Sequence, residues 1–554
     1  MSDGVDRRGF FRIVGTSAAA AAAAGCGKTT EAILPYVVPA QNIVPGVPSW
    51  FATVCRECPA GCGVLAKNRE GRVVKLEGNP DHPVNAGALC VRGQASLLGT
   101  YDPDRIPGPR LREGGSWQPL GIPEAEKLLV ERLAAARQDG AGRIAMITQL
   151  ETGTLGRLMD EWLEVVGGRP RVAFEPFAYE AIRAANRATF GQDAIPYHAF
   201  EDAQVVLSLG ADYLETWVSP VGYARGFQRM HGLAGGKAGT VIHVEPRYSM
   251  TAANADEWLA NVPGTERLIA LALLRLVVEA RGTGMPPAVA AAARGVDVEA
   301  ASRESGVPAA RLRQIAEALL TRAPSLVVGG GVAVTGPNAV ETAIAVNLLN
   351  YALGNVGATV RFGPNSTLGQ ASRYAELAGL VRAMAGGEIA ALIVKDANPA
   401  FTLPAAAGFT EALARVPFVV SLSAHLDETT AGAHLVIPDL TPLESWGDCS
   451  PREGVWGLMQ PAMAVVPPAG PRREDVLDLI LRRPTEIFPG VQTRATGDLL
   501  LDVGRALVPA AEKGPLRART FADRLRDAWQ GIAKTFAPGT PFDTFWEEAL
   551  RRGG

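Results

Sequence analysis

Short apolar runs alternate with stretches of helical periodicity along most of the chain. The apolar runs are rich in Val, Ile and Leu and are bounded by Gly, Asp or Pro, which is typical of buried strands. We expect strands within residues 142–150, 203–211, 239–246, 325–333, 390–396 and 418–424. Residues 124–137, 265–280 and 309–320 repeat apolar positions at helical spacing and predict amphipathic helices. This alternation predicts an α/β fold in which helices cover both faces of parallel sheets.

Sheets of this kind bind ligands at the carboxyl ends of their strands. The segments that follow the predicted strands are Gly210-Ala211-Asp212, Glu245-Pro246-Arg247, Gly329-Gly330-Gly331 and residues 396–399. Tight turns also need Gly, Asn and Pro, and the three glycines complete no dinucleotide-binding fingerprint. The residues alone therefore favour plain turns over binding loops.

The composition is that of a globular protein with several cores. Of the 554 residues, 47% are hydrophobic and 20% are charged, and this length suggests about three or four domains. The formal net charge is −3, so the chain has no excess of basic residues for a phosphate backbone. Nucleic acid is not expected as a partner.

Residues 1–30 differ from the rest of the chain. Arg7 and Arg8 precede an Ala-rich apolar stretch that ends at Gly25, a pattern typical of a twin-arginine export signal. The alternative is a basic N-terminus before an Ala-rich helix, while a transmembrane anchor would need a longer and more apolar run. Cys26 also stands where a lipoprotein would be processed and acylated. The twin-arginine route carries folded proteins to the periplasm, so a cofactor inserted before export is expected.

Four of the six cysteines fall in one segment with the spacing C-x2-C-x3-C-x27-C. They are Cys55, Cys58, Cys62 and Cys90. The closely spaced thiols, separated by glycines and a proline, suit one metal centre better than disulfides. Structural zinc sites usually pair two C-x2-C elements, whereas here the fourth cysteine stands alone. The spacing favours a [4Fe-4S] cluster, with zinc or disulfides as the alternatives.

The segment that contains EGRVVKLEGNPDHPVNAGALC and YDPDRI resembles the N-terminal iron–sulfur domain of the molybdopterin (bis-guanine-dinucleotide) oxidoreductases. This family includes polysulfide reductase, formate dehydrogenase and periplasmic nitrate reductase. The resemblance implies that the four cysteines hold a [4Fe-4S] cluster. It also implies that Arg92 lies between the cluster and the pterin and relays electrons.

VEPRYSMTAANADEWLANVPGTE and residues 396–448 resemble the two pterin-domain signatures of the same family. They imply that strand ends hold the guanine-dinucleotide tails, with Gly210, Asp212, Glu245, Arg247 and Asn398 as the residues concerned. The resemblance further implies an iron–sulfur domain at 46–106, an α/β domain split over 107–145 and 370–500, an inserted α/β domain at 146–369 and a C-terminal helical docking segment at 501–554.

Two departures from the family concern molybdenum. Catalytic members supply a Ser, Cys, selenocysteine or Asp ligand from the segment that here spans 171–203, and this segment has no Cys and no Ser. Asp193 and Asp202 remain as candidate ligands, and Cys449 is interpreted as incidental. The chain also ends where catalytic members begin a closing C-terminal β domain, so that domain is expected to be missing.

LGADYLETWVSPVGYARGFQRM, PYVVPAQNIVPG and LTPLESWGD resemble the molybdopterin-like half of the large iron–sulfur subunit of alternative complex III, a quinol-oxidising respiratory complex. Typical members of that group have lost the cluster cysteines, which this chain retains. The resemblance implies an electron-transfer subunit at the periplasmic face of the membrane, attached through its complex or a lipid. Its expected partners are a ferredoxin-like iron–sulfur subunit and a quinol-reactive membrane subunit.

In this interpretation the molybdopterin guanine dinucleotide is not favoured as a cofactor. One alternative is a molybdenum oxidoreductase of the polysulfide reductase type, completed by a partner chain. The other is a metal-free structural scaffold. Near the C-terminus stand four aromatic residues, Phe536, Phe542, Phe545 and Trp546. We expect them to dock a partner, and the alternative is an amphipathic helix that packs on its own domain.

Overall fold

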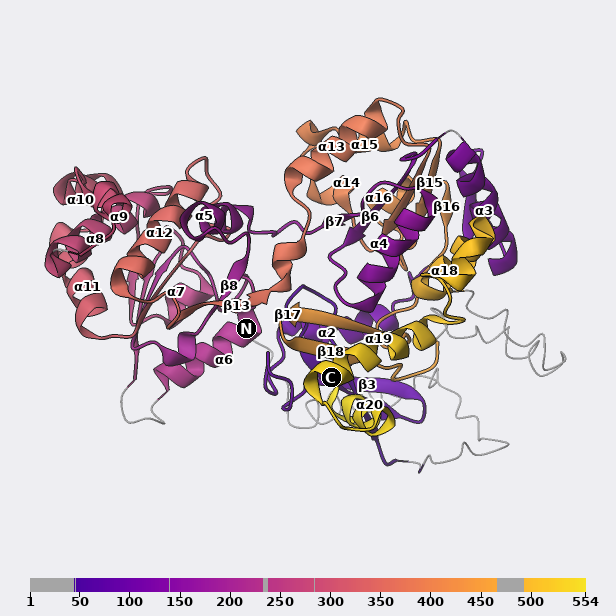
Figure 1. Ribbon diagram of the computed structural model, residues 1–554, viewed down its shortest axis with the longest axis horizontal. Helices are drawn as coiled ribbons and strands as arrows, with labels where there is room; N and C mark the ends of the chain where they lie inside the picture. Colours follow the sequence, from indigo (N-terminus) through magenta and orange to yellow (C-terminus); the bar gives the residue numbers. More distant parts are fainter. Residues whose placement is uncertain (1–43, 45, 139, 233–237, 283, 466–492) are drawn as a thin grey trace, which may run out of the picture. The chain divides into compact units, whose positions relative to one another are not determined.

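The computed structural model describes residues 44, 46–138, 140–232, 238–282, 284–465 and 493–554 (Figure 1). Pro48–Gly554 form one compact unit that contains every helix and strand named below. The predicted export signal at 1–30 and Cys26 lie outside the described residues. Among the helices in the described ranges, none is both long and apolar enough to cross a membrane.

A small antiparallel sheet and one helix carry the four closely spaced cysteines. The sheet consists of β1 (Ser49–Val54), β2 (Gly63–Arg69) and β3 (Arg72–Gly78), and helix α2 (Val91–Thr100) packs beside β3. Three of the cysteines lie between β1 and β2, and Cys90 is the N-cap residue of α2. Gly61, between two of them, has a φ of +52°, and a Cβ there would lie 3.1 Å from Pro451. This turn therefore requires glycine.

A seven-stranded sheet joins two segments that are far apart in the sequence. In order, its strands are β5 (Ser116–Pro119), β4 (Arg110–Glu113), β16 (Leu435–Val436), β15 (Phe418–Ser421), β14 (Ala391–Lys395), β6 (Ile144–Gln149) and β7 (Val172–Phe174). The strands from β16 to β7 are parallel, whereas β4 and β5 pair antiparallel at one edge.

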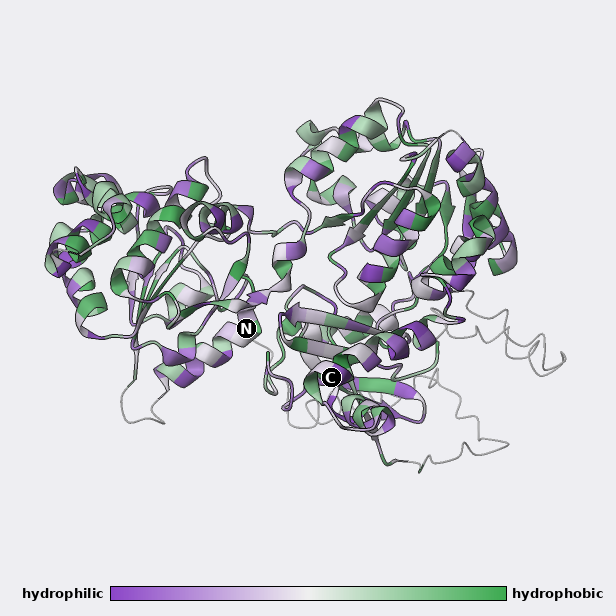
Figure 2. Cartoon of the chain, in the orientation of Figure 1, coloured by the Kyte–Doolittle hydropathy of each residue, from purple (hydrophilic) through white to green (hydrophobic). Residues whose placement is uncertain are grey.

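Helices cover both faces of this sheet. One face packs on α3 (Ile122–Gln138), α4 (Thr154–Val166) and α18 (Thr496–Leu507), and the other on α13 (Tyr374–Ala385) and α15 (Phe409–Leu413). Successive residues such as Met146 and Ile147 are therefore buried on opposite faces. That is why the central strands β6, β14 and β15 are mainly apolar, as Figure 2 shows.

A second sheet is parallel throughout. Its order is β11 (Glu257–Leu259), β10 (Thr240–Val244), β9 (Val205–Leu209) and β12 (Ser325–Gly329). One face packs on α8 (Glu266–Arg281), α11 (Ala309–Thr321) and α12 (Ala339–Leu353), and the other contacts α6 (Pro220–His231). Each predicted strand and helix overlaps its expected range closely, and the predicted α/β fold is confirmed.

The other helices are short or lie beside these layers. They are α5 (Glu180–Phe190), α7 (Met250–Asn254), α9 (Pro287–Ala293), α10 (Val298–Ser305), α14 (Pro399–Thr402) and α16 (Glu428–Ala431), with the 3-10 helices η1 (Phe200–Asp202), η3 (Thr367–Gln370), η4 (Ala405–Ala407) and η6 (Pro509–Lys513).

An antiparallel sheet that the sequence did not predict has the order β18 (Val455–Met459), β17 (Gly447–Arg452), β13 (Val360–Ser366) and β8 (Ile195–His198). Strands β13 and β17 contain Gly, Pro and polar residues, which are depleted in strands, so no local pattern marks them. The domain limits expected at 46–106, 107–145, 146–369 and 370–500 remain predictions.

The C-terminal aromatic residues divide between core and surface. Helices α19 (Phe521–Phe536) and α20 (Phe542–Arg552) pack together, and Trp546 is buried with Trp529 and Leu458. Phe542 and Phe545 are half-buried against the same cluster. Trp546 therefore follows the self-packing alternative and not the predicted docking role, because its ring fills a core of its own chain. Phe536 is 54% exposed.

Candidate functional site

The four predicted cluster cysteines lie in one small apolar group of side chains. Cys62 is buried, and Cys55, Cys58 and Cys90 are half-buried beside it. The backbone N–H of Cys55 donates to the carbonyl of Cys62 at 2.8 Å, which closes the loop between β1 and β2. All four thiols are free, so disulfides do not describe this structure.

The surroundings of these thiols suit a positively charged metal centre. Burial, and then the neighbouring thiols Cys58 and Cys90, raise the pKa of Cys55 to about 12. Burial and the same neighbours also raise the pKa of Cys62. Four thiolates can therefore gather here only if cations lie among them, and this donor set fits a [4Fe-4S] cluster. Within the described residues, no three His, Cys, Asp or Glu side chains are grouped to hold a single metal ion.

Arg92, the predicted electron relay, is exposed in the first turn of α2. Its guanidinium acts electrostatically on two carboxyl groups, those of Glu57 and Glu175. Burial raises the pKa of both carboxyl groups, and Arg92 opposes that effect. Arg92 is therefore a solvent-facing cation at the mouth of the cysteine site.

A cleft of about 910 Å³ lies beside the cysteines at the carboxyl ends of both parallel sheets. On the cysteine side its walls include Cys58, Cys90 and Arg92. On the side of the sheets they include Gln149 at the end of β6, Glu175 after β7, Leu214–Thr216 and Met250 after β9 and β10, and Asp396–Asn398 after β14. Parallel strands thus present their ends to a space that adjoins the expected cluster.

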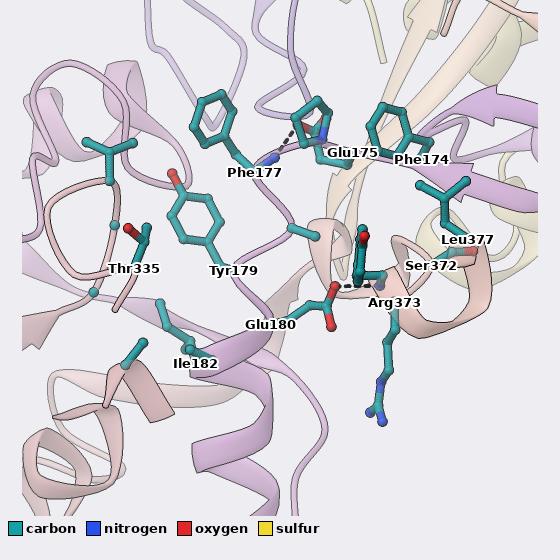
Figure 3. A pocket seen from close by; sticks show the side chains of 18 of the residues that line it. Phe174, Glu175, Phe177, Tyr179, Glu180, Ile182, Thr335, Ser372, Arg373 and Leu377 are labelled. Carbon is teal, nitrogen blue, oxygen red and sulfur yellow. Dashed lines mark hydrogen bonds between the residues drawn. The ribbon is translucent and has the colours of Figure 1, made fainter. Parts of the chain in front are cut away.

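A second cavity of about 430 Å³ adjoins this cleft and shares Glu175, Phe177 and Tyr179 with it. Figure 3 shows the rings of Phe177 and Tyr179 on one side of this cavity, while the guanidinium of Arg373 extends away from them. Arg373 forms an ion pair with Asp193. The cavity is mainly apolar, with Ile182 and Leu377 among its walls.

The strand-end residues expected to hold a cofactor contact one another. Arg247 donates to Glu245 and to Asp212, at 2.8 Å each. The remaining oxygens accept from Thr251 at 2.6 Å or approach His243 at 2.9 Å. These residues do not line the cleft, and their carboxylates are bonded to other groups of the same chain.

Gly210 and Asn398 have separate positions. Gly210 has a φ of +74°, and a Cβ there would lie 2.5 Å from Val334, so its role is to let β9 end against the β12 turn. Asn398 does line the cleft, but its amide donates to Glu428 at 2.6 Å and accepts from Thr429 at 2.8 Å. Of the five residues, only Asn398 therefore reaches the cleft.

Neither candidate molybdenum ligand reaches the cleft. Asp193 is bound by Arg183, Arg187 and Arg373, and Asp202 pairs with Arg361. The carboxylate that the 171–203 segment does place in the cleft is Glu175. Sequence reasoning missed it because it considered only the residue types known as ligands in the family.

A buried chain of ion pairs was also missed. Arg56 follows Cys55 directly and donates to Glu151 at 2.6 Å, and Lys395 lies 3.6 Å from the same carboxylate. Arg56 also contacts the thiol of Cys449, which was interpreted as incidental. A Cβ on Gly61 would lie 3.2 Å from that sulfur. The sequence held one signal for these ion pairs, which is the charged residue Arg56 inside the cysteine motif.

Two family models match the chain. The molybdopterin oxidoreductase Fe4S4 domain matches residues 48–102, and molybdopterin oxidoreductase matches residues 105–477. These matches agree with the family resemblance of the cysteine-bearing segment and of the two pterin-domain signatures.

Curated relatives include one whose match spans nearly the whole of this chain. The menaquinone reductase molybdopterin-binding-like subunit of Nitratidesulfovibrio vulgaris is 29% identical, over 98% of this chain and 76% of that protein. The arsenate respiratory reductase molybdopterin-containing subunit of a Shewanella species is 25% identical over 44% of this chain, and a nitrate reductase of Symbiobacterium thermophilum is 30% identical over 49%. The chain matches only 29% and 35% of those two proteins.

Among solved structures, acetylene hydratase from Pelobacter acetylenicus superimposes with a TM-score of 0.62 at 15% identity, over 85% of this chain and 72% of that chain. At this identity the likeness shows a shared fold.

Proposed function

The chain belongs to the molybdopterin oxidoreductase family, and we propose that it is the iron–sulfur electron-transfer subunit of a membrane-associated respiratory complex. One [4Fe-4S] cluster, held by Cys55, Cys58, Cys62 and Cys90, supplies one-electron transfer. The match of the Fe4S4 family model to residues 48–102 supports this assignment.

The observation that carries the proposal is a contrast between two groups of residues. The four cluster thiols are complete and gathered, whereas the residues expected to hold a pterin dinucleotide are bound mainly to one another. In addition, both aspartates of the 171–203 segment form ion pairs with arginines. In catalytic relatives this segment supplies the molybdenum ligand. We therefore propose that electron transfer does not depend on molybdenum, although the family match is consistent with a molybdopterin cofactor.

We propose the setting by analogy with alternative complex III and with the relative named a menaquinone reductase subunit. The chain would face the periplasm after twin-arginine export and would be held at the membrane through its complex or through Cys26. Its partners would be a ferredoxin-like iron–sulfur subunit and a quinol-reactive membrane subunit.

One observation favours a second candidate function, a molybdenum oxidoreductase of the polysulfide reductase type. Glu175 places a carboxylate in the cleft from the segment that carries the metal ligand in catalytic relatives. The cleft of about 910 Å³ also offers room for an organic cofactor. A partner chain would then have to complete the enzyme.

Metal analysis of the anaerobically purified chain separates these functions. We expect about four iron atoms per chain and no stoichiometric molybdenum or tungsten. Cys58→Ser should lose the cluster, because Cys58 is one of the four ligands. The matched control, Cys449→Ser, should keep its iron. One molybdenum per chain would establish the second candidate function. Protein that holds neither iron nor molybdenum would instead indicate a metal-free structural scaffold.

A further inference from the structure

Two arginines lie close to the expected cluster, and they differ in their exposure to solvent. Arg92 is exposed at the cleft mouth, whereas the side chain of Arg56 is only 13% exposed and follows Cys55 directly. Arg56 also contacts Cys449, whose sulfur lies beside the turn between Cys58 and Cys62. A buried charge is screened far less than an exposed one, so salt weakens the field of Arg56 less than that of Arg92.

The position of Arg56 is fixed by a chain of buried charges. Its Nη2 lies 2.6 Å from Glu151 Oε2, and Lys395 Nζ lies 3.6 Å from the other oxygen of that carboxylate. Lys395 in turn lies 3.2 Å from Asp439 and also pairs with Asp396. The side chains of Glu151 and Lys395 are both 5% exposed.

Positive and negative side chains alternate along this row of buried ion pairs. Glu151 is shared between two cations, and Lys395 also pairs with Asp396 and Asp439. Burial opposes ionisation of Glu151, but Arg56 and Lys395 outweigh it and lower the pKa of that carboxyl. Among the cations of this row of ion pairs, Arg56 is the one that directly follows a cluster cysteine, Cys55.

We propose that Arg56 is a positioning residue for electron transfer, held by Glu151 and Lys395 so that its positive charge stabilises the reduced cluster. The inference rests on the cluster assigned in the proposed function. Reduction adds one electron to the cluster and forms no bond, and the donor is the redox partner. Arg56 contributes charge alone and takes no electron.

The test is a redox titration of the cluster in the full chain, followed by electron paramagnetic resonance. Arg56→Gln should lower the midpoint potential by about 59 mV, which is tenfold in the one-electron equilibrium constant. Arg56→Lys keeps the charge and should stay close to wild type. Glu151→Gln removes a negative charge and should raise the potential. Arg69→Gln, at an exposed site of the same small sheet, is the matched control and should change nothing.

Salt separates the buried cation from the exposed one. Arg92→Gln should lower the potential at low ionic strength, and its effect should fade in about 1 M salt, where the screening length is about 3 Å. The effect of Arg56→Gln should persist in the same salt. If Arg56→Gln loses iron, Arg56→Lys and Glu151→Gln still decide the question.

Several outcomes would overturn the inference. They are an unchanged midpoint in Arg56→Gln, shifts of the same sign in Arg56→Gln and Glu151→Gln, or an Arg56 effect that disappears in salt. Failure of the proposed function would look different, because the wild-type protein would then hold no iron to titrate.

Discussion

Single residues of this chain are held in protonation states that the folded interior dictates. His198, at the end of β8, lies with its ring centre 4.9 Å from that of Trp217, and its Nδ1 lies 3.4 Å from the hydroxyl of Tyr223. Burial lowers the pKa of His198 to about 3 and that of His82 to about 4. Both imidazoles are therefore neutral at physiological pH, and protonation of either one opposes folding.

The pH dependence of stability follows from these two histidines. The unfolded chain binds a proton at the usual His pKa of about 6.5. Between that pH and the lowered value the unfolded state holds more protons, so the free energy of unfolding is fully retained above about pH 6.5 and falls below it. As the pH falls through this window, each histidine lowers the free energy of unfolding by about 1.4 kcal/mol per pH unit.

His198→Phe tests this at one site. The variant keeps a ring beside Trp217 but has no proton to bind, so urea unfolding at pH 7.5 and 5.5 should show a smaller loss of stability than in wild type. A pH dependence identical to that of wild type would show that His198 does not titrate on unfolding.

Among the secondary-structure elements, the two last helices show how local signals combine with packing. Helix α19 starts with a capping box between Thr520 and Asp523, which is a local signal. Its place is fixed by Trp529, whose Nε1 donates to Asp448 of β17 at 3.0 Å. Trp546 of α20 then packs edge-to-face on Trp529, with ring centres 6.0 Å apart. Both helices are therefore anchored on the antiparallel sheet.

Trp546→Ala should destabilise the chain by about 3–5 kcal/mol, because it removes a large ring from a packed core. The matched control is Phe536→Ala, on the exposed end of α19, which should change stability by less than about 0.5 kcal/mol. Urea unfolding of both variants, with iron content as a second readout, checks the prediction. Equal stability of the two variants would contradict the self-packed position of Trp546.

At the scale of the whole molecule, one buried ion pair connects the end of the cysteine-bearing segment to a residue far along the chain. Arg105 donates to both carboxylate oxygens of Glu444, at 3.2 and 2.8 Å. The two side chains are 1% and 0% exposed. Glu444 also accepts from Thr441, so the pair belongs to a hydrogen-bonded network.

Arg105→Met should lower the free energy of unfolding by about 3–5 kcal/mol, because it removes the guanidinium that neutralises the buried carboxylate of Glu444. The double variant with Glu444→Leu should recover most of that loss, since no buried charge then remains. A double-mutant cycle from urea unfolding measures the coupling. Additive single effects would show that the pair does not tie the two segments together.

Prediction from sequence succeeded where the signal was local. The apolar runs at 142–150 and 390–396 became β6 and β14, because strands buried on both faces need continuous apolar residues. It failed for β13 and β17, because strands with Gly, Pro and polar residues form only when neighbouring strands supply their hydrogen bonds.

The sequence by itself determined the parallel sheets, their helices and the four-cysteine motif, because periodicity and spacing act over a few residues. The tertiary structure alone decided which charges meet. Arg56 and Glu151 are 95 residues apart, and the strand order that brings them together leaves no local pattern. The same order placed Glu175 in the cleft and turned Asp193 toward arginines. Contacts between distant segments depend on how the strand ends are arranged, which only the packed sheets define.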